Sequence, residues 1–339
     1  MGHTRRGAQL TMSTKFRWGI LAPGKIAHKF VAGVQSLPDA EVVAVGSRTL
    51  EKAQAFAAQY KIPRAYGSYA ELAADKNLDA IYVATPHNFH LDAALLCFRQ
   101  GRPVLCEKPM APNLAQAREM VECARANRVF LMEALWTRFQ PAMGVVRQWL
   151  DAGRIGELRR LECDFSFRAP FNPESRLFNP ALAGGGLLDV GIYALALTSW
   201  VFKGLPERHA SLAALGETGV DEQAGVFFLY PRGEMAVLTF GTRTQGTISA
   251  RIVGTEGCIE IPTPFYRAQE AVLKVGQTEI RERRPFSASG YEYEAIEVAR
   301  CVRAGLTESP SVPLDESLSL ATTMDRLRAE WGVCYPFES

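Results

Sequence analysis

Short apolar runs alternate with amphipathic stretches from residue 16 to about residue 133. The apolar runs lie at residues 17–21, 41–45, 79–84, 103–105 and 129–132, and helix-like patterns at 24–36, 50–59, 89–99 and 113–127 separate them. Strands that are apolar at nearly every position are typical of a parallel sheet covered on both faces, and right-handed crossovers make such a sheet doubly wound. This part of the chain is therefore predicted to be an α/β domain of the Rossmann type.

The pattern changes after residue 148, where apolar and polar positions begin to alternate. Strand-like segments follow at 159–167, 211–216, 224–230, 235–241, 246–253 and 258–261, and helices are expected at 139–150, 189–200, 291–303 and 314–331. Consecutive alternating strands favour an antiparallel sheet. We therefore predict a disordered extension over 1–15, a Rossmann domain over 16–134, and an α+β domain over 135–339 with a large, mostly antiparallel open sheet.

Charge and cysteine content narrow the class of protein. The 339 residues carry 38 basic and 36 acidic side chains without a block of like charge, which favours neither a nucleic-acid nor a membrane-surface partner. The seven cysteines form no Cys-x-x-Cys pair, as expected for reduced thiols. Neither an apolar stretch of membrane-spanning length nor a signal peptide is expected. These features predict a cytoplasmic protein without a membrane partner.

A candidate phosphate-binding turn follows the first apolar run. Ala22-Pro23-Gly24-Lys25-Ile26 lies between a predicted strand and a predicted helix, where backbone amides can approach a pyrophosphate. Gly24 fits the glycine fingerprint of dinucleotide-binding turns, whereas Ala22 occupies the position of its first glycine. We predict that Ala22, Gly24, Lys25 and Ile26 bind a cofactor; an ordinary strand-to-helix turn is the alternative.

The end of the second strand bears on the choice of cofactor. It reads Gly46-Ser47-Arg48-Thr49, with Lys52 one turn later, and no carboxylate stands there to bind an adenine ribose. Ser47 and Thr49 can form hydrogen bonds, and Arg48 can stack on adenine or bind a 2′-phosphate. NADP is therefore favoured over NAD. The alternative is an ordinary capped start of a solvated helix.

Two segments far apart in the chain offer an acid–base pair. Lys108 follows an apolar run, at the carboxyl end of a predicted strand, and Tyr193 follows the glycine-rich segment 184–191. Hydride transfer at a hydroxyl-bearing carbon needs a group that exchanges the hydroxyl proton, and a nearby lysine ammonium is expected to lower the pKa of a tyrosine. Asp189 lies one helical turn before Tyr193 and would share its face. A surface lysine and a core tyrosine are the alternatives.

A polar segment follows the strand that ends at Ala84. Thr85, Pro86, His87, Asn88 and His90 lie at another strand end and are expected to line the pocket. His87 and His90 without a third ligand do not predict a zinc site. We expect no metal; His90 could instead be a structural histidine at a helix start.

The segment that joins the two predicted domains carries Trp136 and Arg138. Trp136 could stack on a nicotinamide or a substrate ring, or simply pack in the core. Arg138 could meet the phosphates of a cofactor.

These motifs together resemble the Gfo/Idh/MocA family of oxidoreductases. The resemblance rests on the Gly24 turn, Thr85-Pro86-His87, Glu107-Lys108-Pro109 and the glycine-rich segment that ends at Tyr193, and it extends from Phe16 to the C-terminus. Segments 66–69, 133–139 and 188–193 look closest to the dimeric dihydrodiol dehydrogenase branch, which uses NADP and also oxidises D-xylose.

The resemblance implies a role for each matching residue. Lys108 and Tyr193 would be catalytic, with Asp189 supporting the substrate, and His87, Trp136 and Phe165 would bind the substrate. The implied cofactor-binding residues are Ala22, Gly24, Lys25, Ile26, Ser47, Arg48, Thr49, Lys52, Thr85, Pro86, Asn88, His90, Glu107, Lys108 and Arg138. A homodimer joined through the open sheet is also implied.

The expected reaction is hydride transfer between NADP and a carbon of a sugar or vicinal diol. The pocket-edge segment 168–177 is too generic to name the substrate. Two alternatives stay open: an NADPH-dependent reductase of a keto- or anhydro-sugar, and a non-catalytic NADP-binding sensor.

Overall fold

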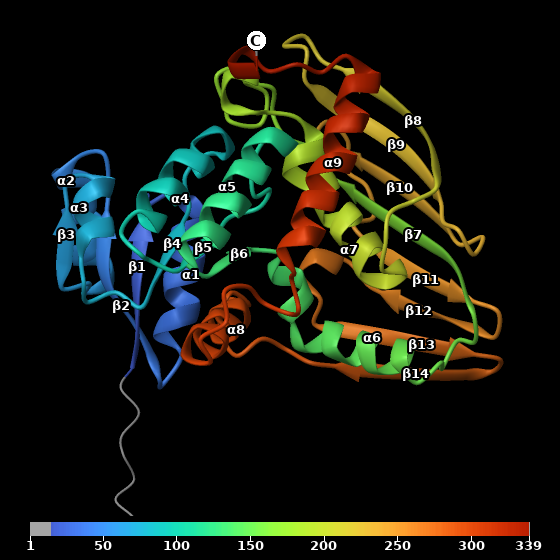
Figure 1. Ribbon diagram of the computed structural model, residues 1–339. Helices are drawn as coiled ribbons and strands as arrows, with labels where there is room; N and C mark the ends of the chain where they lie inside the picture. The colour runs from blue at the N-terminus through green and yellow to red at the C-terminus, as the bar shows by residue number, and fades with distance from the viewer. Residues whose placement is uncertain (1–14, 339) are drawn as a thin grey trace, which may run out of the picture.

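The computed structural model describes residues 15–338, which form two β-sheets with helices around and between them (Figure 1). The first sheet is parallel, with strand order β3-β2-β1-β4-β5-β6. Its strands are β1 (Phe16–Leu21), β2 (Ala40–Gly46), β3 (Arg64–Tyr66), β4 (Ala80–Val83), β5 (Val104–Cys106) and β6 (Leu131–Glu133), and its helices are α1 (Lys25–Gln35), α2 (Leu50–Tyr60), α3 (Tyr69–Ala74), α4 (His90–Phe98) and α5 (Leu114–Asn127). The predicted Rossmann architecture is confirmed.

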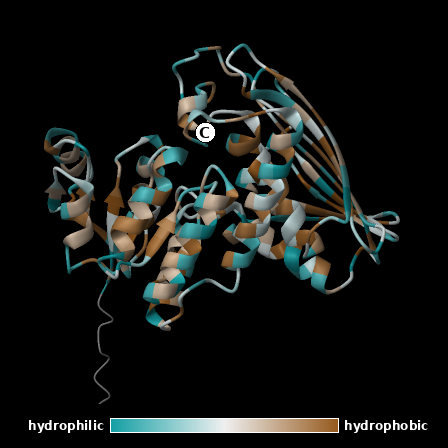
Figure 2. Ribbon diagram, turned by 45° about the horizontal axis from the view of Figure 1, so that its top comes forward, coloured by the Kyte–Doolittle hydropathy of each residue, from teal (hydrophilic) through white to brown (hydrophobic). Residues whose placement is uncertain are grey.

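Both faces of this sheet are covered. All four residues of β4 are buried, and successive side chains of a strand point to opposite faces. Tyr82 accordingly joins one hydrophobic cluster, whereas Ile81 and Val83 join another. The helices turn apolar sides toward the sheet and polar sides outward, as Figure 2 shows. A strand buried on both faces needs apolar residues throughout, which explains the uninterrupted apolar runs.

The second sheet has eight strands in the order β14-β13-β12-β11-β7-β10-β9-β8. Its strands are β7 (Leu158–Ser166), β8 (Arg208–Leu215), β9 (Asp221–Leu229), β10 (Met235–Gly241), β11 (Ala250–Gly254), β12 (Gly257–Ile261), β13 (Glu270–Val275) and β14 (Thr278–Arg283). Adjacent strands are antiparallel except β7 and β10, which run parallel. The mostly antiparallel sheet is confirmed. Strands β13 and β14 were not predicted. Strand β14 is a charged edge strand, Thr-Glu-Ile-Arg-Glu-Arg, and it has no apolar face that would mark it in the sequence.

Helices cover one face of this second sheet. They are α6 (Pro141–Asp151), α7 (Ile192–Phe202) and α9 (Leu314–Trp331), whereas α8 (Glu292–Arg303) packs on α1 of the first domain. Helices α7 and α9 lie between the two sheets, and α6 runs along β13 and β14 (Figure 1). A single π-helical turn, Leu187–Gly191, leads directly into α7.

The last helices also complete the first domain. Helix α8 packs on α1, and α9 packs on α5 and β6. The Arg303 guanidinium lies 3.0 Å from the Asp39 carboxylate, and the amide of Leu131 in β6 donates to the Thr307 carbonyl at 3.1 Å. The predicted division after residue 134 therefore describes the order of the chain, whereas the Rossmann layer also uses residues beyond 290. Residues 1–14 of the predicted extension lie outside the described residues.

One segment departs from the expectation on membrane-spanning length. Pro180–Phe202 is long and apolar enough to cross a membrane, although 78% of its apolar window is buried inside the protein. The expectation that no stretch reaches this length is therefore wrong. The burial gives the reason for its apolar composition: α7 contacts both β7 and α9, and most of its residues are buried.

Candidate active site

The turn after β1 has a backbone suited to a phosphate group. Ala22 adopts a left-handed conformation with φ of 74°, which glycine adopts more readily than alanine. Gly24 is the N-cap of α1, and it contributes no side-chain cap; no acidic residue lies in the first turn. The first-turn amides of Lys25 and Ile26 therefore face a region free of a competing carboxylate, and the positive end of the helix favours an anion there. These residues fit the pyrophosphate of a dinucleotide.

The residues predicted to bind cofactor at the end of β2 differ in their surroundings: Thr49 caps a helix, whereas Arg48 is exposed. Ser47 is buried and Arg48 is exposed. The hydroxyl of Thr49 accepts a hydrogen bond from the Lys52 amide at 3.4 Å and so caps α2. Arg48 is the cationic side chain at this strand end that extends into solvent, where a ribose or its phosphate would lie.

Lys108, Asp189 and Tyr193 meet where the two sheets adjoin. Lys108 follows β5, Asp189 lies in the π-helical turn, and Tyr193 lies in the first turn of α7. The Lys108 ammonium donates to the Asp189 main-chain carbonyl at 2.6 Å, and it lies 3.9 Å from the Asp189 carboxylate. It also lies 4.7 Å from the centre of the Tyr193 ring. The structure thus brings Lys108 together with two residues that lie more than eighty positions later in the sequence.

The glycine-rich segment makes this approach possible. Gly185 has φ of 122°, and a Cβ added there would collide with the buried Asp221 carboxylate. That carboxylate accepts a hydrogen bond from the Leu187 amide at 2.6 Å, which anchors the start of the π-helical turn. Glycine is therefore required at residue 185, and Asp221 is an anchor that the sequence did not reveal.

Opposite charges shift the titration of the carboxylate and the lysine. Burial alone would raise the pKa of Asp189, but Lys108 and Arg176 lower it to about 2. Burial lowers the pKa of Lys108, and Asp189 offsets part of that effect. Asp189 is therefore ionised at neutral pH, while the Lys108 pKa moves toward the range useful for proton transfer.

Tyr193 does not follow the expectation that Lys108 lowers its pKa. Burial, followed by the nearby Glu107 charge, raises the pKa of Tyr193 well above its ordinary value. The Lys108 ammonium lies over the ring, and the hydroxyl oxygen accepts its hydrogen bond from Trp136 Nε1 at 3.2 Å. The expectation is corrected: in this structure, burial outweighs the charge on Lys108, and Tyr193 is a neutral phenol.

Two buried acids lie near this site: Glu107, which contacts the Lys108 backbone, and Glu294, whose pKa responds to its burial and to the charge on Glu107. The Tyr82 hydroxyl donates to Glu107, whose other oxygen accepts from the Lys108 amide at 3.2 Å. Both Glu294 carboxylate oxygens are buried without a hydrogen-bond partner among the described residues, and burial raises the pKa of this acid well above its usual range. Glu107 was predicted to bind cofactor; here its oxygens bind Tyr82 and the Lys108 backbone. Sequence reasoning did not find Tyr82 or Glu294.

His87 contacts the segment before the π-helical turn, whereas His90 is held between backbone carbonyls. The His87 Nδ1 is 3.4 Å from the Ala183 carbonyl, and burial lowers the pKa of this ring well below its usual value. His90 is fully buried, its ring nitrogens lie 2.9 Å from the carbonyls of Thr85 and Pro109, and its pKa falls to about 4 because of burial. His90 therefore links two loops, as a structural histidine does, and we remove it from the cofactor set.

The remaining residues of this loop, Thr85, Pro86 and Asn88, lie at the end of β4. Asn88 donates to the Ala181 carbonyl at 3.1 Å and so connects this loop to the segment before the π-helical turn. Among residues 15–338, no group of three or more His, Cys, Asp or Glu residues could hold a metal ion.

An aromatic wall surrounds Tyr193. Trp136 is 2% exposed and stacks on Tyr291 with ring centres 4.3 Å apart. Phe165 is buried and stacks on Tyr266 at 4.6 Å, and each of these two rings tilts against Tyr193. Tyr291 covers one face of the Trp136 indole, and the indole N–H group donates to the Tyr193 hydroxyl, so Trp136 orients Tyr193. The sequence did not single out Tyr266 or Tyr291.

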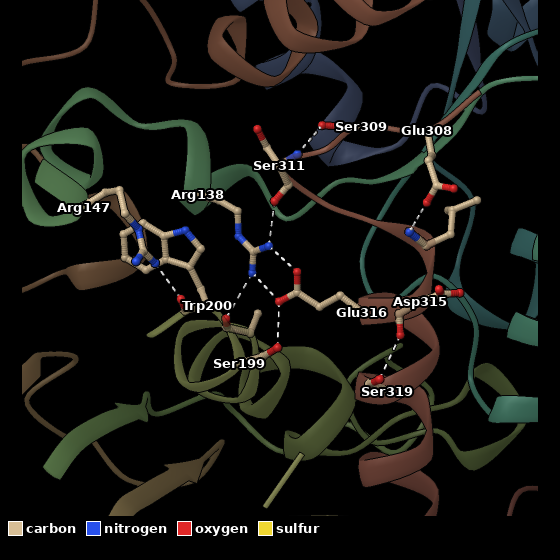
Figure 3. A network of polar contacts seen from close by, with 12 residues as sticks. Arg138, Arg147, Ser199, Trp200, Glu308, Ser309, Ser311, Asp315, Glu316 and Ser319 are labelled. Atoms are coloured by element: carbon tan, nitrogen blue, oxygen red, sulfur yellow. Dashed lines mark hydrogen bonds and ion pairs between the residues drawn. The ribbon is translucent and has the colours of Figure 1, made fainter. Parts of the chain in front are cut away.

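Arg138 belongs to a different network, shown in Figure 3. Its guanidinium binds the Glu316 carboxylate through two nitrogens, at 2.5 and 2.8 Å, and donates to the carbonyls of Ser311 and Ala196. These partners come from α7 and α9 and from the segment before α9. Both terminal nitrogens of the Arg138 guanidinium are thus engaged within the protein, so the expectation that it meets cofactor phosphates is corrected.

Arg176 enters the site although its segment looked generic. One of its guanidinium nitrogens lies 2.8 Å from the Asp189 carboxylate, and the other lies 3.4 Å from His87 Nε2. Nothing in the local sequence distinguishes Arg176 from Arg168, which lies in the same loop. Only the path of the loop from β7 to the π-helical turn makes the difference.

Comparison with known proteins agrees with this architecture. The family model described as "Oxidoreductase family, NAD-binding Rossmann fold" matches residues 16–135, and the one described as "GFO/IDH/MocA C-terminal domain" matches residues 143–260. The trans-1,2-dihydrobenzene-1,2-diol dehydrogenases of Mus musculus and Homo sapiens are 41% and 40% identical to the chain, over 94% of it and 98% of each relative.

Solved structures share the fold at lower identity. An aldose–aldose oxidoreductase from Caulobacter crescentus, complexed with glycerol, superposes with a TM-score of 0.84 at 24% identity, covering 93% of this chain and 98% of its own. A 3-ketoreductase from Actinomadura kijaniata in complex with NADP and TDP-benzene gives 0.82 at 23% identity, with the same coverage. From the two family models and the full-length relatives together, this chain belongs to the Gfo/Idh/MocA family of oxidoreductases.

Proposed function

We propose that this protein is an NADP-dependent oxidoreductase that transfers a hydride between the nicotinamide and a carbon of a sugar or vicinal diol. The observation that carries the proposal is the approach of Lys108 to Tyr193 and Asp189 at the carboxyl edge of the Rossmann sheet. In α/β sheets, ligands bind in the crevice at this edge. The relatives named trans-1,2-dihydrobenzene-1,2-diol dehydrogenase support a diol substrate.

The Lys108–Tyr193 pair handles the proton in this proposal. The nicotinamide, when bound, accepts or supplies the hydride; the protein must take or give the hydroxyl proton of the substrate. Tyr193 is the acid/base group, and Lys108 lies over its ring with a lowered pKa. Because two coupled groups titrate together, the pair is expected to show joint apparent pKa values. Asp189 keeps Lys108 in place through its main-chain carbonyl.

One observation favours a second candidate, reduction of a keto- or anhydro-sugar. Burial raises the pKa of Tyr193, so its hydroxyl is protonated at neutral pH. A protonated phenol donates a proton to a developing alkoxide, as reduction requires, whereas oxidation needs a base first. The same residues serve both directions, so the direction becomes a question of relative rates.

The preference for NADP rests on Arg48. It is an exposed cation at the end of β2, where the adenine ribose of a dinucleotide lies in this fold. A guanidinium can bind a 2′-phosphate through two parallel hydrogen bonds. The proposed cofactor set comprises Ala22, Gly24, Lys25, Ile26, Ser47, Arg48, Thr49, Lys52, Thr85, Pro86, Asn88, Glu107 and Lys108.

We also propose a cytoplasmic homodimer joined through the open face of the eight-stranded sheet. An apolar strip crosses three neighbouring strands there; it comprises Ala210, Leu212, Phe227, Met235 and Val237. Leu212 is 83% exposed and Phe227 is 50% exposed. Contiguous apolar area of this kind is typical of an interaction surface.

The test is the reduction of NADP⁺, followed by the absorbance of the reduced nicotinamide, with a panel of aldoses, inositols and trans-dihydrodiols and with NAD⁺ in parallel. Turnover of D-xylose or a dihydrodiol with NADP⁺ is the expected result. Silence across the panel, with NADPH oxidation by a keto-sugar, would favour the reductase. Tight NADPH binding without turnover in either direction would favour a sensor and contradict the proposal.

A further inference from the structure

Arg176 approaches the site from a loop that belongs to neither sheet. The loop runs from the end of β7 to Pro180, and the Arg176 side chain is 45% exposed. Its guanidinium lies 2.8 Å from the Asp189 carboxylate, closer than the Lys108 ammonium at 3.9 Å. The nearest cation to the carboxylate is therefore the arginine. The lysine makes its shortest contact with the Asp189 main chain instead.

A second contact fixes the guanidinium. Its other nitrogen is 3.4 Å from His87 Nε2, and His87 Nδ1 is 3.4 Å from the Ala183 carbonyl. A neutral His87 with its proton on Nδ1 satisfies both contacts, because Nδ1 then donates to the carbonyl and Nε2 accepts from Arg176. Arg176 thus bridges the loop after β4, through His87, and the π-helical turn, through Asp189.

We propose that Arg176 is a positioning residue of this site: it holds the Asp189 carboxylate, so that the Lys108 ammonium stays over the Tyr193 ring and is not drawn into closer contact with that carboxylate. The inference rests on the proposed acid–base function of that pair. An ammonium 3.9 Å from a free carboxylate would move toward it, because opposite charges in a half-buried site attract strongly. With Arg176 in place, that charge is already balanced.

The charged and titratable groups that face Arg176 and Lys108 come from several elements. They are Glu107, Lys108 and Glu133 at the Rossmann edge, His87 and His90 after β4, Asp189 and Tyr193 at the start of α7, and Tyr266 before β13. Arg176→Gln removes a positive charge near Lys108 and frees Asp189 to pair with it. Both changes stabilise the ammonium form, so they act in the same direction on Lys108.

The first experiment measures Lys108 directly, without substrate. The protein is labelled with ¹³C at the lysine ε-carbon, the Lys108 signal is assigned by its loss in Lys108→Met, and it is titrated by NMR. We expect Arg176→Gln to raise the Lys108 pKa by about one unit and Arg176→Lys to stay closer to the parent. An unchanged Lys108 titration in Arg176→Gln would overturn the proposal.

A matched control separates positioning from general loosening of the loop. Arg243 lies over Phe171 and Phe178 of the same loop, with ring centres at 5.3 and 5.6 Å, and its polar contacts are to the Ala169 carbonyl and the Glu222 carboxylate, not to Asp189. Arg243→Gln therefore weakens the packing of the loop and leaves the charge at Asp189 in place. It should titrate like the parent. A shift equal to that of Arg176→Gln would mean that loop order alone is responsible, and would overturn the proposal.

The second experiment uses the pH profile of kcat/KM for oxidation. The acid limb should move to higher pH by about one unit in Arg176→Gln, because a more basic Lys108–Tyr193 pair must lose its proton first. A higher KM with an unchanged profile would make Arg176 a substrate ligand and overturn its positioning role. If the parent turns over nothing while the NMR shift is present, the proposed function fails and the positioning role stands.

Discussion

The two sheets bury their residues in opposite ways. Every residue of β4 in the parallel sheet is buried, whereas β9 in the eight-stranded sheet alternates, with Phe227 50% exposed and Phe228 3% exposed. A sheet covered on both faces can offer side chains to a ligand only at its strand ends, as with Lys108 after β5. A sheet with one open face can offer a whole face, and it places Phe165 beside Tyr193 from its inner side. The proposed active site lies where the edge of one sheet meets the inner face of the other.

The largest effect is expected where the two sheets meet. Lys108→Met and Tyr193→Phe should each lower kcat by about 10²- to 10⁴-fold, because each removes a member of the proton-handling pair. NADPH binding, measured by fluorescence, should change little. Since the pair acts as a unit, the double variant should lose less than the product of the two single losses.

Lys76→Met is the matched control, since Lys76 is an exposed lysine between α3 and β4. It should retain the turnover of the parent. Retention of activity within a few-fold in both Lys108→Met and Tyr193→Phe, on the true substrate, would show that the acid–base assignment is wrong.

Two neighbouring phenylalanines test the inner and open faces of the second sheet. Phe228→Ala should lower the free energy of unfolding by about 3–5 kcal/mol, because it leaves a cavity in the core. Phe227→Ala, one position away on the open face, should cost the monomer only about 0.5 kcal/mol. Urea unfolding of both variants, at a protein concentration below that of dimer formation, measures the difference. Equal losses would contradict the one-sided burial of this sheet.

The open face also predicts the oligomeric state. Phe227→Asp should weaken the dimer by at least about 30-fold, because it buries a charge at the centre of the apolar strip. Sedimentation velocity over a dilution series measures the dissociation. Leu306→Asp is the control, since Leu306 is 40% exposed and lies after α8, outside the strip. A parent that sediments as a monomer at every concentration would remove the case for this interface.

A smaller and more selective effect is expected at the end of β2. Arg48→Ala should weaken NADP⁺ by about tenfold and NAD⁺ much less, because a charged hydrogen bond to the 2′-phosphate contributes roughly 1.5–3 kcal/mol. Titration of both cofactors by fluorescence gives the two dissociation constants. Lys61→Ala, an exposed position past the end of α2, is the control. Equal losses for the two cofactors would remove the reason for naming NADP.

The strands of the parallel sheet were easier to predict from the sequence than those of the eight-stranded sheet, for the same reason of burial. The parallel strands were recognisable because burial on both faces leaves an uninterrupted apolar run, as in residues 79–84. Strand β14 was missed because an edge strand that faces solvent needs no apolar side. The meeting of Lys108 with Tyr193 was predictable from strand-end logic and the family resemblance, since both positions carry recognisable motifs.

Other parts of the site depend on distances that no local pattern encodes. Arg176 contacts Asp189, which lies thirteen residues later, because the irregular loop between them folds back. Arg138 was assigned to phosphates because its charge was visible, whereas its partner Glu316 lies far away in the sequence. The raised pKa of Tyr193 reflects the depth of its burial, which only the packed aromatic wall determines.

The return of the C-terminal helices to the Rossmann layer has a consequence for synthesis. The amide of Leu131 in β6 donates a hydrogen bond to the Thr307 carbonyl, and α8 packs on α1. A nascent chain that has emerged only through β6 lacks these partners, so the first domain cannot complete its core on the ribosome ahead of the second. We expect the two domains to mature together near chain termination, and a fragment ending at residue 134 to be a client of chaperones.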